Sequence, residues 1–554
     1  MKFSLAAAFC LAILISSYSF PQVDNIPSDN EVYKFLHRKF IEGLLTDYDD
    51  IILPLSRNQI SKFLYQIRSQ EEKLSPLDKE LLHRFIVKLG DSDSLYALNF
   101  FDGFPNEFLE NVASDKEKHL YKFKDQTVTF VIDPILNLNN LYSGSSKKGA
   151  TLFNYGAKIR GSFDNWLGFS VQASNGVVFG DRVTALLDKR VEQSFTFNDT
   201  KINYFDETEG YVRLEKDFLD FQLGRERILW GRGQTNKLIL SENPPQFDFI
   251  KFKLHYKILR YDFIHGWLVT KPEFVKIGDD ISKEKRSKYI AISRLGINPS
   301  NNLSFGVSQM IIYSNRAFEA AYLNPFLFWE SAQRSLNDLD NSFLVFDGRY
   351  KFIDGLLING SAIFDDINFD RLFKGEWTGH NNGFAWQTGI SLTNPILPEN
   401  LILNLEYLQL RPYIFSHWGY KESLTYTNNG YLLGVDLQPN STRFSVDLLY
   451  HLTSRITIGM KYFYSLHGNN EYDSLGNRTR NVGGNVFEYY TLQDSTFAYL
   501  LDGLRETEHK VRLSFNWEFL NNIYFNLEFE NLSNSYFENR NYFSFFTSLK
   551  IKLD

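Results

Sequence analysis

One short segment combines three cations, two glycines and a tryptophan within nine residues. The cations are Arg225, Arg227 and Arg232, and Trp230 lies among them. Guanidinium groups can bind carboxylates through two parallel hydrogen bonds, and an indole can stack on a sugar ring, so the segment is a candidate site for acidic sugars. The alternative, which we favour, is structural: the arginines pair with acids such as Glu226 in the lumen of the fold, and the glycines allow a bend or bulge.

Two acidic clusters form a second candidate. Asp340 and Asn341 lie in a polar loop, and Asp365 and Asp366 follow a predicted strand. Oxygen ligands of this kind can hold Ca²⁺ or accept hydrogen bonds from sugar hydroxyls. A solvated loop explains the same pattern, and we favour that explanation over a calcium site.

Tyr322, Asn324 and Trp329 could form a platform for a sugar. Aromatic residues at a strand end are also typical of the girdles that anchor a protein at a membrane interface. Both interpretations remain open from the sequence.

No enzyme class is nominated. The histidines have no metal-ligand spacing, the Gly–Arg–Gly element lacks the context of a nucleotide loop, and no G-x-S-x-G elbow is present. We therefore predict a non-enzymatic protein with no catalytic residue, no metal and no cofactor.

The composition restricts the elements that can position these residues. The chain of 554 residues is 16% aromatic, with 51 Phe, 31 Tyr and 8 Trp, and 23% charged. Aromatic residues favour strands and argue against disorder, while the negative mean hydropathy argues against a helical membrane bundle. A net charge of −7 gives no basic footprint for nucleic acid.

The first 19 residues are typical of a secretory signal peptide. Lys2 is followed by the apolar run 5–15 and by small residues at 17–19. The single cysteine, Cys10, lies in this segment, so the exported chain needs no disulfide.

Residues 20–122 are predicted to form a small periplasmic helical domain. Ser28 with Glu31 and Ser56 with Gln59 have capping-box spacing, and a third helix is expected from Ser75 to Gly90. A further helix is expected over 108–121.

From 123 to 554 the hydrophobic period changes to two, and polar residues alternate with apolar ones along strand after strand. Short turns alternate with long polar stretches (181–209 and 468–508), and aromatic residues gather at strand ends. These features on an exported chain predict a mainly β fold, a transmembrane antiparallel barrel of about 18 strands preceded by the α-helical domain.

An ordered series of motifs resembles the Wzi family of outer-membrane capsule-assembly proteins, in particular members with an N-terminal helical domain. The densest similarity covers residues 223–247, where Arg232 replaces the family's usual proline. Further similarities are spread along the rest of the chain and comprise residues 54–57, 293–295, 309–313, 322–325, 340–341, 365–366, 411–413, 416–417 and 433–434. The resemblance implies an 18-stranded barrel with a periplasmic helical bundle.

The resemblance also implies a lectin-like protein that attaches or organises capsular polysaccharide. We therefore expect a monomer in the outer membrane of a Gram-negative-type bacterium after signal cleavage, with capsular or extracellular polysaccharide, outer-membrane lipid and other export or assembly proteins as partners. The alternatives are a porin-like channel, suggested by inward charges such as Lys158 and Arg512, and a barrel hydrolase.

Overall fold

The computed structural model describes residues 22–89, 97–99, 117–125, 127–164, 166–270, 273–277, 280–284, 286–324, 326–337, 340–365, 374–375, 383–417, 423–488, 491, 493–495, 498–535 and 540–552. The predicted signal peptide (1–19), Asp366 and the stretch 108–116 of the predicted fourth helix lie outside these residues. No described helix is long and apolar enough to cross a membrane.

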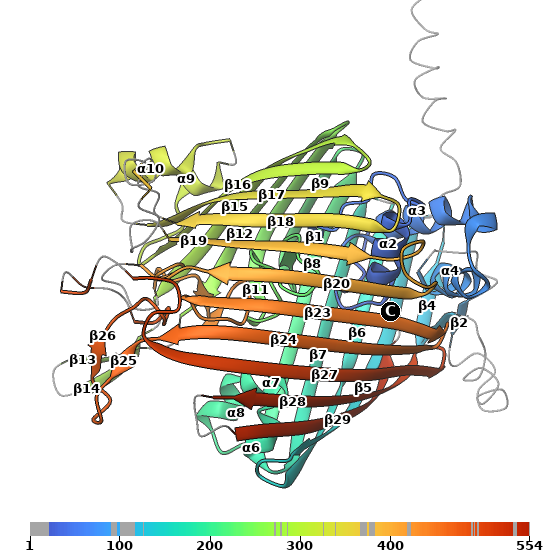
Figure 1. Cartoon of the computed structure of the whole chain (residues 1–554). Helices are drawn as coiled ribbons and strands as arrows, with labels where there is room; N and C mark the ends of the chain where they lie inside the picture. Colours follow the sequence, from blue (N-terminus) through green and yellow to red (C-terminus); the bar gives the residue numbers. More distant parts are fainter. Residues whose placement is uncertain are drawn as a thin grey trace, which may run out of the picture.

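Eighteen described strands form one closed antiparallel barrel, as predicted, with β29 pairing with β5 to complete the wall (Figure 1). The strands are β5 (Val128–Ser143), β6 (Lys148–Phe163), β7 (Leu167–Gly180), β8 (Tyr204–Lys216), β9 (Leu219–Glu226), β11 (Phe247–Tyr256), β12 (Leu259–Val269), β15 (Ser287–Ser300), β16 (Leu303–Ser314), β17 (Asn341–Ile353), β18 (Leu356–Asp365), β19 (Gly383–Leu392), β20 (Leu401–Leu410), β23 (Ser441–Thr453), β24 (Ile456–Asn469), β27 (Leu504–Leu520), β28 (Ile523–Asn534) and β29 (Arg540–Lys552).

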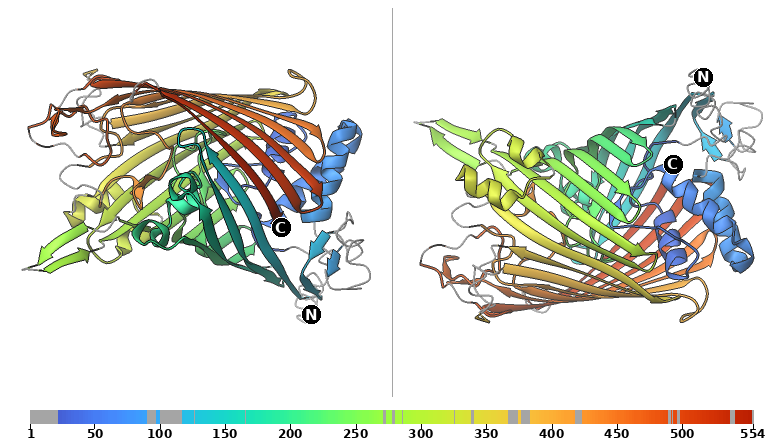
Figure 2. Two further views of the ribbon diagram at one scale, coloured as in Figure 1. Left: turned by 90° about the horizontal axis from the view of Figure 1, so that it is seen from below. Right: turned by 90° about the horizontal axis from the view of Figure 1, so that it is seen from above.

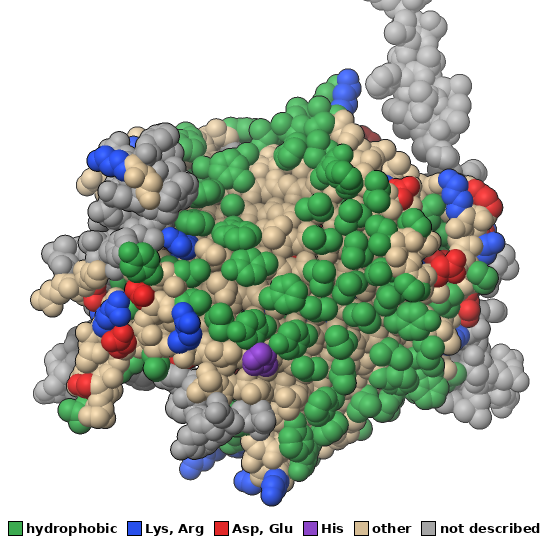
Figure 3. Space-filling view, viewed as in Figure 1, with side chains coloured by type: hydrophobic (Ala, Val, Ile, Leu, Met, Phe, Trp, Pro, Cys, Tyr) green, Lys and Arg blue, Asp and Glu red, His purple; other side chains and the backbone are tan. Residues whose placement is uncertain are grey.

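The two faces of the wall follow the predicted alternation. In β6, Phe153 and Tyr155 are exposed on the outside, while Asn154, Lys158 and Arg160 are buried in the lumen. Apolar side chains cover the outer wall between the two ends, and charged side chains gather near the ends (Figure 3). A closed barrel with an apolar belt leaves no unpaired edge in lipid, which is the requirement for a bacterial outer-membrane protein.

Three N-terminal helices lie at one end of the barrel (Figures 1 and 2): α2 (Val32–Ile41), α3 (Arg57–Arg68) and α4 (Pro76–Leu89). Short turns join the strands at this end and long loops join them at the other, so the helices mark the periplasmic end. The capping box of Ser56 and Gln59 is confirmed, and Ser75 accepts from the amide of Asp78 as expected. The box predicted at Ser28 and Glu31 is wrong, because the side chain of Asn30 accepts from the amide of Val32.

The helices share one apolar core with the inside of the barrel. Leu357, Ile402 and Leu449 of the wall pack with the buried residues of α2–α4. The chain before α3 extends further into the lumen, where β1 (Ile52–Leu53) pairs with β10 (Leu229–Trp230). The N-terminal segment 22–89, called the plug below, therefore closes the periplasmic end from within.

The helix predicted over 108–121 is wrong in its described part. β3 (Glu117–His119) pairs with β2 (Ala97–Asn99), and β4 (Tyr121–Lys124) pairs with β5 beside the barrel closure. The Asp125 carboxylate accepts from the amides of Thr127 and Val128, which turns the chain directly from β4 into β5.

Long connections at the extracellular end carry the remaining elements. Residues 227–246 fold into the lumen and contain β10. The other extracellular connections contain α6 (Arg182–Ala185), α7 (Lys189–Glu192), α8 (Phe195–Asp199), β13 (Glu273–Ile277), β14 (Asp280–Glu284), α9 (Ala320–Leu323), α10 (Trp329–Leu336), β21 (Thr427–Asn428), β22 (Tyr431–Leu432), β25 (Glu471–Tyr472) and β26 (Arg478–Arg480). The 3-10 turn η1 (Glu71–Lys73) lies in the plug, between α3 and α4.

Candidate functional site

Trp230 and Arg232 are structural residues of the lumen. Trp230 is only 1% exposed and packs in the apolar cluster that fills the extracellular half of the barrel. Arg232 binds Asp49 of the plug and Asp347 of the wall, each at 2.8 Å. The indole therefore offers no face to a sugar, and the structural interpretation holds for this part of the segment. Gly231 has φ +144°, which provides the expected bend.

Arg225 and Arg227 lie on opposite faces of the wall. Because Gln222 and Glu226 face the lumen, Arg225 points outward, where it binds Asp248 at 2.8 and 2.9 Å. The expectation that Arg225 pairs inside the lumen is therefore wrong. Arg227 remains inside and donates to the carbonyl of Glu242.

The predicted sugar platform is a packed cluster on the outer wall. Tyr322 is buried, and its hydroxyl donates to Asp340 at 2.6 Å. Asp340 also binds Arg316, and the backbone carbonyl of Asn324 accepts from the indole of Trp329. The structure thus brings Tyr322, Asn324 and Asp340 together, but their polar groups are engaged within the protein.

Asn341 and Asp365 face the lumen and hold loops. Asn341 donates to the carbonyl of Leu424, and Asp365 accepts from the amide of Phe415, both at 2.9 Å. In the described part of the chain, no three His, Cys, Asp or Glu side chains come close enough to hold a metal ion. Of the described predicted site residues, Arg227 lines a cavity of the lumen.

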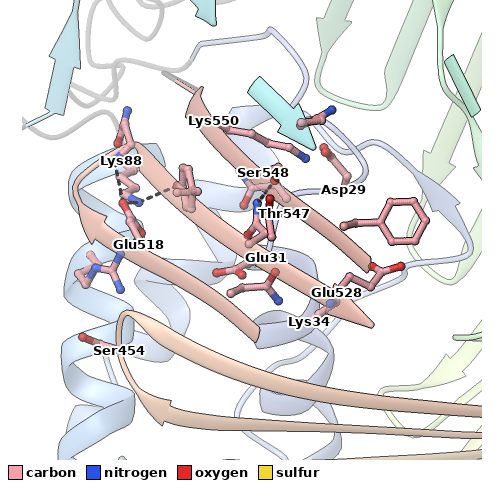
Figure 4. A pocket seen from close by; sticks show the side chains of 18 of the residues that line it. Asp29, Glu31, Lys34, Lys88, Ser454, Glu518, Glu528, Thr547, Ser548 and Lys550 are labelled. Carbon is pink, nitrogen blue, oxygen red and sulfur yellow. Dashed lines mark hydrogen bonds and ion pairs between the residues drawn. The ribbon is translucent and has the colours of Figure 1, made fainter. Parts of the chain in front are cut away.

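Two polar cavities lie between the plug and the lumenal wall. Cavity A, of about 400 Å³, is bounded by α4, β27, β28 and β29 (Figure 4). Cavity B, of about 530 Å³, is bounded by β5–β8, α7 and Arg227. The residues common to both linings are Asp29, Asn139, Asp188, Phe546 and Lys550. The two cavities are therefore adjacent along one side of the barrel, from the periplasmic helices to an extracellular loop.

Strand register places polar side chains in rows across this wall. In the first row Asn516 faces Asn526, Asn526 faces Ser548, and Ser548 faces Asn139. The amide of Asn526 donates to the Ser548 hydroxyl at 2.9 Å. The second row consists of Glu518, Tyr524, Lys550, Asn137 and Asn154. The rows are two residues apart, which corresponds to roughly 7 Å along a strand.

Charged side chains of α4 and of the α7 loop lie at the two ends of the region that the polar rows and the two cavities occupy. At the periplasmic end, Arg84 and Lys88 of α4 both bind Glu518 (Figure 4 shows Lys88 at this carboxylate). Burial lowers the pKa of Lys88 although Glu518 favours its charged form. At the extracellular end, Asp188 binds Arg190 at 2.7 Å. Burial alone would raise the pKa of Asp188, but the Arg190 guanidinium lowers it.

This arrangement suits hydroxyl-rich ligands. Amide and hydroxyl side chains can each donate and accept hydrogen bonds, and the carboxylates and Lys550 can bind hydroxyls or acidic substituents through charge-assisted bonds. Tyr524 and Phe546 add apolar surface to the lining. Cavities of this size hold small-molecule ligands, so the site can hold a few sugar units rather than an entire polymer.

Sequence reasoning placed these residues on the polar side of their strands but did not nominate them as a site. Asn526 and Ser548 each look like any lumenal position within their own strand. Only the register between β27, β28, β29 and β5 places them in one row. The usable signal was weak: Asn516, Asn526 and Ser548 stand at inward positions of strands whose outward positions are mostly apolar.

Comparisons with known proteins agree with this architecture. The family model "Capsule assembly protein Wzi" matches residues 139–542. The structure of Wzi from Escherichia coli, an outer-membrane protein involved in group 1 capsule assembly and described as a carbohydrate-binding β-barrel, aligns with a TM-score of 0.57 at 12% identity, covering 95% of this chain and 99% of that one.

OprD of Pseudomonas aeruginosa aligns with a TM-score of 0.41 at 11% identity, over 76% of this chain and 94% of that one. No curated protein matches the chain. The family match covers more than half of the chain and coincides with the closed barrel and its apolar belt. The protein is therefore an outer-membrane β-barrel that belongs to the Wzi family of capsule assembly proteins.

Proposed function

We propose that this protein binds capsular or extracellular polysaccharide at the cell surface and helps to organise it there, without catalysis. The observation that carries the proposal is the pair of polar rows across β27, β28, β29 and β5, which border cavities A and B. Family membership and the carbohydrate binding described for Escherichia coli Wzi support the same ligand class.

The mechanism is non-covalent retention of a polymer. A chain end or side branch enters the lumen beside α7, and its hydroxyls exchange water for the side chains of the two rows. Lys550 and Arg227 can bind acidic substituents, and carboxylates of the linings such as Glu528 can accept hydrogen bonds from sugar hydroxyls. Each contact is weak, but a repeating polymer presents many copies of the same epitope, which raises the effective concentration at the cell surface.

The direct test uses the purified full chain in detergent and the native capsular or exopolysaccharide of the source organism. We expect retention of the polysaccharide on immobilised protein, weakened by salt if acidic substituents contribute. An unrelated neutral polymer of the same length serves as the control ligand. The absence of retention at low salt, with calcium present, would refute the proposal.

Conductance measurements in planar bilayers distinguish a porin-like channel from a polysaccharide-binding barrel. The plug crosses the lumen through buried contacts such as Arg160 with Gln22 at 2.8 Å and the plug residue Asn25 with Glu226 at 2.7 Å. We therefore expect no steady conductance from the full chain. A steady open channel without glycan retention would favour the porin-like function instead.

A further inference from the structure

We propose that the α9–α10 segment holds one acyl chain of an outer-leaflet lipid against the outer wall of the barrel. The proposal does not depend on polysaccharide binding. It concerns a second surface, which lies on the lipid side of β12, β15 and β16, and it begins from where this extracellular segment packs.

Alternating residues show that the segment packs outside the barrel. Ile290, Ile292, Met310 and Ile312 belong to the lumenal core that contains Trp230. Their neighbours in β15 and β16 point the opposite way and pack with α9 and α10; this outer cluster comprises Phe263, Ala291, Ile311, Tyr313, Tyr322, Trp329 and Ala332. The segment after β16 thus folds back along the lipid-facing wall.

Polar contacts hold the segment in this position. Gln309 faces outward, where an amide side chain without hydrogen-bond partners in lipid would cost several kcal/mol. Its side chain donates to the carbonyl of Leu327 at 2.8 Å and accepts from the amide of Trp329 at 3.1 Å. The Tyr313 hydroxyl accepts from the amide of Glu319. The wall and the segment therefore satisfy each other's polar groups.

A groove of about 520 Å³ remains between the tip of the segment and the wall. Its lining is almost entirely apolar and includes Tyr261, Leu295, Val307, Leu344, Phe326 and Phe328. Phe326 stacks on Tyr261, with 5.5 Å between ring centroids, and forms one side of the groove. The charged residue of the lining, Arg260, is engaged by Asp47 of the plug.

The position of the groove decides its occupant. Leu295 and Val307 are half exposed and continuous with the apolar belt that contacts lipid. Phe326 and Phe328 are 77% and 57% exposed and belong to the connection between α9 and α10, which descends along the wall from the extracellular end. The lining continues to Tyr256 and Leu259 beside the short turn between β11 and β12, so the groove follows the apolar wall towards the periplasmic end. The chemistry that fits a groove open to the hydrocarbon region is a hydrocarbon tail that enters from the extracellular side.

The test uses the full chain in vesicles that contain phosphatidylethanolamine with a photoreactive diazirine on one acyl chain. After illumination, mass spectrometry locates the adducts. We expect adducts concentrated on 326–328 and on the facing parts of β12 and β15. V307W fills the groove, and F326S/F328S removes the aromatic side chains that form one side of it. Each variant should lower these adducts about tenfold, because the acyl chain loses burial equivalent to one large apolar group.

F318S is the matched control, because Phe318 is 56% exposed on the same loop and does not line the groove. A heat-dependent shift in gel mobility checks that each variant is folded. Adducts spread evenly around the belt, or unchanged in both groove variants, would overturn the proposal. A dimer on native gels in which 326–328 carry no adducts would also overturn it, because a second copy of the chain would then be the occupant.

Discussion

The side chain of Arg232 donates from Nε to the carboxylate of Asp347 at 2.8 Å, although the two residues lie 115 positions apart in the chain. The same guanidinium binds Asp49 of the plug, and Asp347 also binds Arg294 at 2.7 Å. Plug, inward loop and barrel wall therefore meet at one buried ionic cluster. Removing one member of such a cluster lowers the stability of the fold strongly, because the remaining charges stay buried without a partner.

The first prediction concerns this cluster. R232M should destabilise the packing of the plug by about 3 kcal/mol and speed hydrogen exchange in residues 49–55 and 229–240. R480M is the control, because Arg480 pairs with Glu471 on an exposed loop hairpin, where a pair contributes less than about 1 kcal/mol. Equal effects of the two variants would argue against the anchoring role of Arg232.

The second prediction concerns the stability of the plug at low pH. Burial alone would raise the pKa of Asp78, but Arg38 and Lys39 outweigh it and lower the pKa below its ordinary 3.8. A carboxyl with a depressed folded-state pKa contributes stability that is complete above the unfolded pKa and is lost as the pH falls through the folded one. The protection factors of amides in α2 and α4, which compare observed with intrinsic exchange at the same pH, should therefore be constant from pH 8 to about 5 and fall below about 4.

D78N is the matched variant for that experiment. It should speed exchange in α2 already at pH 7, since Arg38 and Lys39 then keep only Glu42 as a charged partner, and it should flatten the response of the protection factors to acid. An unchanged acid response in D78N would assign the pH dependence to other carboxyls of the plug.

The third prediction tests the polar rows. N526A/S548A should lower the affinity for the native polysaccharide about thirtyfold, because two net hydrogen bonds of about 1 kcal/mol each are lost. S391A/N404A removes a cross-strand Ser–Asn bond of the same chemistry, 2.6 Å long, between β19 and β20 in another part of the wall. Since that pair lines neither cavity, its loss should leave retention unchanged.

The fourth prediction separates structure from recognition at Trp230. W230A should destabilise the inward loop by about 3–5 kcal/mol, the cost of a cavity in a packed core, and leave the affinity per folded molecule unchanged. Trp517, 42% exposed on the outer belt, serves as the control, and W517A should not affect the inward loop. A loss of affinity in folded W230A would restore Trp230 as a sugar contact.

The sequence by itself determined the fold class. Alternation is a local property, so the residues of β6 or β28 reveal which side chains face lipid and which face the lumen, and short turns with long loops indicate the orientation of the barrel. Helix capping at Ser56 and Ser75 is equally local, and both caps are present.

Only the tertiary structure decided which polar and aromatic residues are available to a ligand. Trp230 is buried because β1, more than 170 positions earlier, pairs with β10, and Tyr322 is buried because its loop folds back onto the outer wall. The row of Asn516, Asn526, Ser548 and Asn139 depends on the register at which β29 closes on β5. Register and closure are set by packing around the whole barrel, a non-local quantity that no single strand encodes.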